Sequence, residues 1–343
     1  MHDGLRWPVV FLGCILAGVV PVAVNTLLTP KDYAFMLQDS RAHGLVVSEA
    51  LWPQFADILH TAPACKQVFI DSDVPPAHAK SIAQVIRDTQ RLPHAATTLA
   101  DDVCFWLYSS GSTGSPKGTL HLHSHIIQTA HLYGQGVLGL QENDVVFSAA
   151  KLFFAYGLGN ALSFPLAQGA TTVLLGKRAT PADVFHLLKT HQPTVFYGVP
   201  TLFASLLADA DRPAAQELNL RVCTSAGEAL PAEIGKRWQA EFGVEILDGI
   251  GSTEMLHAFI ACRPGQVRAG ATGQVVPGYQ ACVLGDDGQP VPPGVVGRLA
   301  VKGPTGCRYL DDPRQTSYVQ NGWNLTGDAY RVDEDGFYWY QSR

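Results

Sequence analysis

Short apolar runs alternate with amphipathic stretches over the first three quarters of the chain. Runs at residues 20–25 and 44–48 have the length of buried strands, whereas residues 31–40 repeat their apolar positions at helical spacing. The same patterns predict further strands at residues 66–71, 104–109, 171–175, 194–199, 221–226 and 245–249, and helices at 181–190 and 231–242. This strand–helix rhythm indicates mostly parallel sheets with helices on both faces.

The pattern changes after residue 269, where short apolar pieces are separated by Gly and Pro. The strands expected there are residues 273–276, 279–284, 297–302 and 337–340. Pieces of this kind are typical of a small β-barrel or antiparallel unit. We therefore expect an α/β fold in which two doubly wound, mostly parallel sheet units (1–168 and 169–268) pack together and a small β-barrel-like unit (269–343) follows.

One apolar run, residues 9–24, could be mistaken for a signal sequence or a membrane span. It is short for a span, and Gly13, Gly18 and Pro21 interrupt it. We expect instead a buried helix at 9–17 and a buried strand at 20–24, with no insertion into a membrane.

Composition narrows the function classes. The 343 residues are 47% hydrophobic and carry a net charge of −6, which favours sizeable cores and argues against a nucleic-acid-binding protein. The seven cysteines contain no CxxC pair, so neither a zinc knuckle nor a disulfide framework is expected, and a cytoplasmic protein is the simplest interpretation. The histidine-rich stretch 121–131 has no cysteine or carboxylate at metal-ligand spacing, so we expect no metal site there.

A Ser/Gly-rich segment at residues 108–118, YSSGSTGSPKG, directly follows the buried part of the predicted strand, residues 104–107. Glycines let the backbone approach an anion, and hydroxyl and amide groups donate hydrogen bonds to phosphate oxygens. It is not a Walker A motif, because Gly118 follows Lys117. A flexible linker is the alternative, but its position after a buried strand favours a phosphate loop. The predicted phosphate-binding residues are Ser109, Ser110, Gly111, Ser112, Thr113, Gly114 and Lys117.

This segment resembles the phosphate loop of the acyl-adenylate-forming superfamily, which includes acyl-CoA synthetases, peptide-synthetase adenylation domains and luciferases. Three more segments match that superfamily in the required order: SAGEALP at 225–231, DGIGSTEM at 248–255 and TGD at 326–328. The resemblance implies that Thr253 meets the α-phosphate of ATP and that Glu254 holds Mg²⁺, a hard cation that prefers oxygen ligands. With Lys117 these are the predicted catalytic groups. For nucleotide binding it also implies Gly227 and Glu228 along the adenine, and Asp328 and Arg343 beside the ribose. Four further residues are implied to bind the nucleotide: Ala226, Asp248, Gly249 and Ile250.

Within the superfamily, segments 21–28, 148–160, 196–201 and 248–257 resemble the benzoate–CoA ligases. That resemblance implies an acid–thiol ligase that turns an aryl carboxylic acid, ATP and coenzyme A into an aryl-CoA thioester. Apolar walls with few polar groups suit a flat aryl acid. The implied substrate-pocket residues are Ala155, Tyr156, Gly157, Val199, Ile250, Gly251 and His257.

Two departures from that family leave alternatives open. Its members have a further segment before the equivalent of Met1, and beyond Arg343 a mobile lobe with a lysine that promotes adenylation. We therefore expect residues 1–343 alone to bind ligand but to be weakly active or inactive. The alternatives are a non-catalytic nucleotide- or aryl-acid-binding module and an adenylation domain that loads a carrier protein. A homodimer is compatible with the sequence, which does not determine the oligomeric state.

Overall fold

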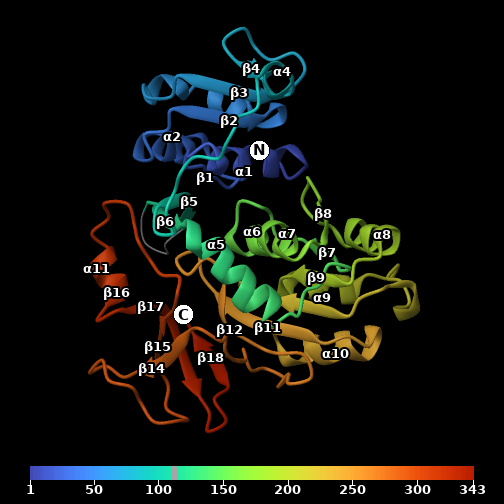
Figure 1. Ribbon diagram of the computed structural model, residues 1–343. Helices are drawn as coiled ribbons and strands as arrows, with labels where there is room; N and C mark the ends of the chain where they lie inside the picture. Colours follow the sequence, from blue (N-terminus) through green and yellow to red (C-terminus); the bar gives the residue numbers. More distant parts are fainter. Residues whose placement is uncertain (110–114) are drawn as a thin grey trace.

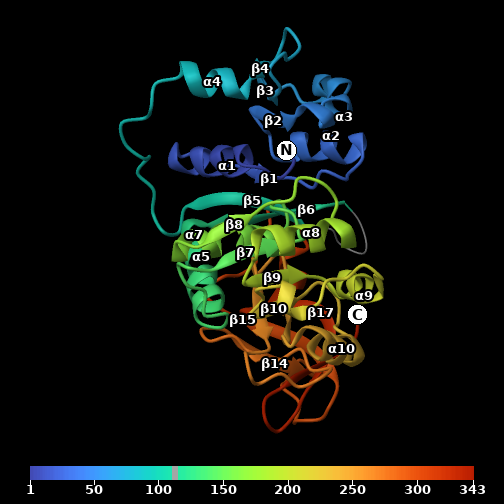
Figure 2. The same ribbon diagram turned by 90° about the vertical axis from the view of Figure 1, so that its right-hand side faces the viewer.

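The computed structural model describes residues 1–109 and 115–343, and these form four sheets (Figure 1). The first hundred residues lie at one end of the molecule, the seven-stranded sheet lies in the middle, and the sheet formed by the last seventy residues lies toward the other end (Figure 2). The architecture is therefore mixed α/β with parallel sheets and a separate antiparallel unit, as the sequence predicts.

The end formed by the first hundred residues is a small parallel sheet of β2 (Gly44–Ser48), β3 (Gln67–Asp71) and β4 (Lys80–Ser81). Its core packs against α2 (Pro30–Asp39) through Tyr33 and Leu37. Thr29 begins α2 with a capping box, because its hydroxyl accepts from the Asp32 amide while the Asp32 carboxylate accepts from the Thr29 amide. The other helices here are α3 (Pro53–Ala56) and α4 (Ile82–Asp88).

A second, three-stranded sheet carries the candidate phosphate segment. β1 (Val22–Ala23) runs parallel to β5 (Val103–Ser109), which pairs antiparallel with β6 (Lys117–Leu122). The sheet packs on α1 (Arg6–Leu16), mainly through Trp7 and Phe11.

Residues 9–24 contain a helix and a strand, but the expectation that both are buried is wrong. Val9, Leu16, Val19 and Val20 are all exposed, and the strand is only two residues long. Gly18 at φ +71° ends the helix, and the chain then joins the edge of a sheet instead of entering its centre. None of the helices formed by residues 1–109 and 115–343 combines the length and hydrophobicity needed to cross a membrane.

The central sheet has the strand order β13-β12-β11-β10-β9-β7-β8. Five strands are parallel, and β12 and β13 add antiparallel at one edge. The strands are β7 (Val145–Ser148), β8 (Thr171–Val173), β9 (Val195–Gly198), β10 (Val222–Ser225), β11 (Ile246–Gly251), β12 (Ala258–Ala261) and β13 (Gln274–Val275). The sheet includes β7 from the predicted first unit (1–168) and β13 from the predicted third unit (269–343), so it extends across both predicted boundaries. The division into three units remains a prediction.

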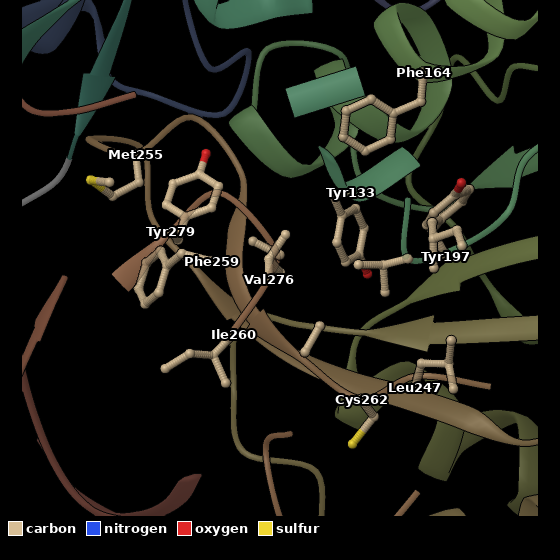
Figure 3. Packing of buried hydrophobic residues seen from close by; sticks show 14 of the residues in the cluster. Tyr133, Phe164, Tyr197, Leu247, Met255, Phe259, Ile260, Cys262, Val276 and Tyr279 are labelled. Carbon is tan, nitrogen blue, oxygen red and sulfur yellow. The ribbon is translucent and has the colours of Figure 1, made fainter. Parts of the chain in front are cut away.

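Both faces of the central sheet are covered. On one face Phe196 and Cys223 share a core with residues of three helices. These are Phe185 of α8 (Pro181–His191), Phe203 of α9 (Pro200–Ala208) and Trp238 of α10 (Ala232–Phe242). The helical segments near the other face are α5 (His123–Thr129), α6 (Ala155–Leu158), α7 (Phe164–Gln168) and the π-helical segments η3 (Ala130–Gln135) and η4 (Gly159–Ser163). Figure 3 shows the core of that face, where aromatic side chains from η3, α7 and β9 converge.

The last unit is a five-stranded antiparallel sheet in which β17 (Trp323–Val332) is the longest strand. Its other strands are β14 (Gln280–Leu284), β15 (Gly297–Lys302), β16 (Val319–Gln320) and β18 (Tyr338–Ser342), and a short helix, α11 (Gln315–Tyr318), precedes β16. Val283, Leu299 and Val301 of this sheet enter the same core as the central sheet. The small unit is thereby packed directly against the unit that carries Glu254.

Candidate functional site

The candidate phosphate segment connects two paired strands. Ser109 ends β5, Lys117 begins β6, and the two residues are register partners. Ser110, Gly111, Ser112, Thr113 and Gly114, all predicted to bind phosphate, lie outside the described residues. Ser109 is buried, and its hydroxyl has no hydrogen-bond partner among the described residues. Binding of phosphate by this hydroxyl stays a prediction.

Lys117 and Glu254 meet although they come from different sheets. Lys117 Nζ lies 3.6 Å from Glu254 Oε1, and both side chains are largely buried. Glu254 sits in the turn that follows β11, next to the half-buried Thr253. The sequence therefore nominated a lysine and a carboxylate that the structure brings together.

Tyr309, which the sequence did not nominate, lies between these two groups. Lys117 Nζ donates to the Tyr309 hydroxyl at 3.0 Å, and that hydroxyl donates to Glu254 Oε1 at 2.7 Å. Burial and the nearby Glu254 carboxylate raise the pKa of Tyr309 above its ordinary value, so the phenol keeps its proton. The ammonium also lies 4.7 Å from the centre of the Tyr309 ring and 5.9 Å from that of Tyr318.

The predicted nucleotide-binding residues at 226–228 and 248–250 lie at the carboxyl ends of β10 and β11. The two strands are parallel neighbours in which Ser225 pairs with Asp248. Gly227 and Glu228 follow β10 and are exposed, as is the start of the loop to α10. Gly227 has φ +93°, a conformation that favours glycine. Ala226 precedes this turn, and the buried Gly249 and half-buried Ile250 lie on the adjacent end of β11.

The Asp248 side chain is buried, in contrast to the exposed Gly227 and Glu228. Its carboxyl lines a cavity of about 90 Å³ together with Leu230 and Ala232 of the α10 start and Arg268 and Gly270 of a following loop. Burial raises the pKa of Asp248 well above its ordinary value. The geometry links Asp248 to the packing of the loop that carries Gly227, and direct contact with a nucleotide stays a prediction.

Asp328 and Arg343 lie together on the small antiparallel sheet. Asp328 is on β17, Arg343 follows β18, and the Arg343 Nε atom is 3.8 Å from Asp328 Oδ1. Burial raises the pKa of Asp328, and the Arg343 guanidinium opposes that shift. The pair has the carboxylate and the cation that were expected beside a ribose.

His257 is enclosed by aromatic rings. Its ring centre lies 4.5 Å from that of Phe164, 4.9 Å from Tyr133 and 5.6 Å from Tyr156; Figure 3 shows Tyr133 and Phe164 on the same side of the core. His257 Nε2 donates to Asn160 Oδ1 at 3.0 Å, and burial lowers the pKa of His257 to about 3. The imidazole is therefore neutral, and its polar partner Asn160 was not nominated from the sequence.

Several other predicted pocket residues adjoin His257. The Tyr156 hydroxyl is 2.6 Å from Thr224 Oγ1, which fixes the phenol over β10. A side chain at Gly251 would meet the His257 carbonyl oxygen at 2.6 Å, so glycine permits this close approach. The remaining nominated residues are Ala155 and Gly157 on α6, Val199 directly after β9, and Ile250 on β11. The structure thus groups an apolar, aromatic region beside the strand ends that carry the predicted nucleotide residues.

The chain matches the family of AMP-binding enzymes over residues 1–308. The chain belongs to the AMP-binding enzyme family. It is 53% identical to a benzoate–CoA ligase of Thauera aromatica over 344 residues, an alignment that covers 99% of this chain and 65% of that relative. The chain therefore spans slightly less than two thirds of the length of this curated relative.

Solved structures of the family have the same fold. A benzoate CoA ligase from Burkholderia xenovorans LB400 is 47% identical, with a TM-score of 0.94 over 100% of this chain and 68% of that one. The anthranilate CoA ligase AuaEII, solved in complex with anthranoyl-AMP, is 38% identical, with a TM-score of 0.96 over 100% of this chain and 67% of that one. The predicted architecture of an adenylate-forming enzyme is confirmed.

Proposed function

We propose that this chain takes part in the ATP-dependent activation of benzoate or a lightly substituted benzoate. In this proposal the acid first becomes an acyl-adenylate with release of pyrophosphate, and then an aryl-CoA thioester with release of AMP. The observation that carries the proposal is the meeting of Lys117 and Glu254 beside the aromatic region around His257. The benzoate–CoA ligase relative at 53% identity supports the choice of acid and of coenzyme A.

The phosphate end of the site would act through charge. The acid's carboxylate oxygen attacks the α-phosphorus of ATP, the bond to the bridging oxygen breaks, and pyrophosphate leaves with that electron pair. Lys117 would stabilise the charge that develops on the leaving group, and Thr253 would donate to the α-phosphate. Preorganised donors of this kind are often the largest contribution to such a step.

Glu254 fits a bound Mg²⁺. Oε1 accepts from Tyr309, which leaves Oε2 for a hard cation that prefers oxygen ligands. No cluster of three His, Cys, Asp or Glu side chains suitable for a metal occurs in residues 1–109 and 115–343, so polyphosphate oxygens would supply further ligands. When bound, Mg²⁺ would neutralise phosphate charge, while Glu254 itself orients the ion.

The nucleoside and the acid would occupy adjoining parts of the strand ends. Gly227, Glu228 and Ile250 would border the adenine, and the Asp328 carboxylate would accept hydrogen bonds from the ribose hydroxyls. The acid would lie against Tyr156 and the neutral His257, since a flat ring gains most from aromatic walls. In the second step the CoA sulfur bonds to the acyl carbon, its proton passes to solvent and AMP leaves. No protein nucleophile is required.

ATP and coenzyme A are co-substrates in this scheme, and a cytoplasmic location and a homodimer belong to the same proposal. It includes no nucleic-acid partner and no membrane partner. The two other hypotheses predict different products: a carrier-loading domain would form the adenylate without favouring coenzyme A, and a binding module would release no pyrophosphate.

The test uses protein expressed from the complete reading frame that encodes this chain. Pyrophosphate release is measured with ATP and either benzoate or octanoate, followed by an assay for the CoA thioester. We expect a higher kcat/KM for benzoate, because a closed flat pocket penalises ordering of a long flexible chain. A preference for octanoate would refute the substrate assignment. Absence of pyrophosphate release with every aryl acid would refute the activity.

A further inference from the structure

The Tyr309 hydroxyl is a hydrogen-bond partner of both Lys117 and Glu254. It accepts from Lys117 Nζ at 3.0 Å and donates to Glu254 Oε1 at 2.7 Å, while Nζ and Oε1 are themselves 3.6 Å apart. The tyrosine side chain is nearly completely buried, at 5% exposure. It therefore uses both of its polar functions on the two groups proposed to handle phosphate and metal.

The backbone around Tyr309 is fixed to the strand that carries Lys117. Tyr309 forms an isolated antiparallel bridge with Thr119 of β6. On either side of it, the Leu120 amide donates to the Arg308 carbonyl at 2.8 Å and the Leu310 amide donates to the Gly118 carbonyl at 2.9 Å. This segment thus acts as a short additional strand beside β6.

A side chain of α11 fixes the same segment from its other edge. Gln315 Oε1 accepts from the Tyr309 amide at 2.8 Å, and Gln315 Nε2 donates to the Cys307 carbonyl at 3.1 Å. Arg314 adds a bond from Nη1 to the Ser115 carbonyl at 3.0 Å, beside the phosphate segment. Because backbone bonds on both edges hold Tyr309, its hydroxyl has a defined position relative to Lys117.

We propose that Tyr309 is a positioning residue for the site, which holds the Lys117 ammonium and the Glu254 carboxylate in place for a metal–nucleotide complex. This inference rests on the proposed function and adds a residue to it. The hydroxyl hydrogen-bonds to both charged groups while they stand 3.6 Å apart, so neither uses its remaining hydrogen-bonding capacity on a direct hydrogen bond to the other. It leaves Glu254 Oε2 for the ion and two further ammonium hydrogens for phosphate oxygens.

Removal of the hydroxyl alone should therefore affect the charged ligand. In Tyr309→Phe the ring remains beside the Lys117 ammonium, but the two hydrogen bonds to charged groups are lost. We expect an increase of about tenfold in the Kd for Mg²⁺–ATP, a similar increase in the Mg²⁺ concentration that gives half-maximal pyrophosphate release, and an unchanged KM for benzoate. Calorimetric titration measures the first quantity without turnover.

Tyr338→Phe is the matched control. Tyr338 is equally buried, at 5%, and its hydroxyl donates to the Ala281 carbonyl at 2.8 Å within the small sheet. Both variants lose one tyrosine hydroxyl from the small β-rich unit, but only Tyr309 contacts Lys117 and Glu254. The control should lower the melting temperature without changing the Kd for Mg²⁺–ATP.

A double variant separates a positioning role from general damage. If Tyr309 acts through Lys117 and Glu254, then Tyr309→Phe should cost less Mg²⁺–ATP affinity in a Glu254→Gln background than in the parent, because one of its two charged partners has already been neutralised. Additive losses would contradict the inference, as would unchanged or tighter Mg²⁺–ATP binding by Tyr309→Phe alone. Tighter binding would identify the phenol as a group that nucleotide must displace.

Failure of the proposed function has a different signature. A parent protein that binds Mg²⁺–ATP more tightly than Tyr309→Phe, but releases no pyrophosphate with benzoate, would retain the positioning role and refute the activity. A parent protein that binds no Mg²⁺–ATP would refute both.

Discussion

At the scale of single residues, burial keeps three histidines neutral near the candidate site. His121, His125 and His257 are 0%, 5% and 3% exposed. Burial lowers the pKa of His121 to about 3, that of His125 to about 4 and that of His257 to about 3. His121 and His125 also lie close together, with their Nδ1 atoms 3.5 Å apart, so a charge on one disfavours a charge on the other.

This burial predicts loss of stability in mild acid. The unfolded chain takes up a proton on His121 below its ordinary pKa of about 6.5, whereas the folded chain does so only near pH 3. Between these values the unfolded state binds more protons, so the free energy of unfolding falls as the pH falls. Replacing His121 by Gln should reduce the fall between pH 7 and pH 5 by about 2 kcal/mol, as measured by urea unfolding.

The comparison is His191→Gln at the exposed end of α8. His121→Gln should change the pH dependence of unfolding more than this exposed substitution does, because only the His121 imidazole is removed from water on folding. An equal pH dependence in His121→Gln and the parent would show that His121 titrates normally in the folded state.

Sequence motifs identified the candidate residues that lie within a short recognisable segment. They did not identify residues whose contacts at the site are made with positions distant in the sequence. Lys117, Glu254 and Asp328 each stand in a short recognisable segment. Tyr309 has no such context, because its function arises from contacts to residues 192 and 55 positions away. Asn160 was missed for the same reason, since its partner His257 is 97 positions away. Packing decides such contacts, and no local pattern encodes them.

At the scale of elements, the π-helical segment η4 begins at Gly159, a position with no room for a side chain. A side chain at Gly159 would place its Cβ 2.5 Å from His257 Cδ2 and 2.7 Å from Phe164 Cζ. Extra residues per turn in a π-helix shift the following side chains, and here the next residue is the His257 partner Asn160. The element and the glycine together set the position of the imidazole.

Gly159→Ala should therefore destabilise the protein by about 1–3 kcal/mol through overpacking. Gly13→Ala in α1 is the matched control, because nothing lies within 4 Å of the added methyl group there. We expect the control to be as stable as the parent or up to about 1 kcal/mol more stable, since alanine favours helix. Urea unfolding of both variants decides the matter, and a Gly159→Ala protein as stable as Gly13→Ala would contradict the packing argument.

Sequence patterns located the parallel strands better than the antiparallel ones. The predicted strand at 194–199 appears as β9, whose four residues are all buried, because a strand covered on both faces is a continuous apolar run. β6 was missed because its first residues belong to the phosphate motif, and β17 because Thr326-Gly327-Asp328 resembles a turn. Gly327, at φ +83°, lies where the register between β17 and β15 shifts, so the ladder continues on either side of an irregularity that glycine permits.

At the scale of the whole molecule, the proposed site would draw residues from three sheets. Lys117 belongs to the three-stranded sheet, Glu254 follows a strand of the seven-stranded sheet, and Asp328 lies in the five-stranded sheet. A ligand that contacts all three residues would connect units that are otherwise joined by packing. Its binding energy would add to the stability of the assembled molecule and not to that of one unit.

A non-hydrolysable benzoyl-adenylate mimic should therefore stabilise residues 1–343 as a whole. At one hundred times its Kd it should add about 2.7 kcal/mol and raise the Tm of a single unfolding transition. Asp328→Asn should reduce this rise, and Asp286→Asn, which changes an exposed carboxylate in a loop of the same sheet, should not. Equal rises in the two variants would exclude Asp328 from the ligand contacts.

The segment that carries Tyr309 also has a consequence for synthesis of the protein. Lys117 leaves the ribosome 192 residues before its hydrogen-bond partner, and at about 5–20 residues per second the interval is roughly 10 to 40 seconds. During this time the edge of β6 that later pairs with residues 308–310 is unprotected, and Lys117 has no phenol beside it. The contact between Tyr309 and Lys117 therefore forms only after residue 309 has emerged, and a nascent chain depends on other cover for that strand until then.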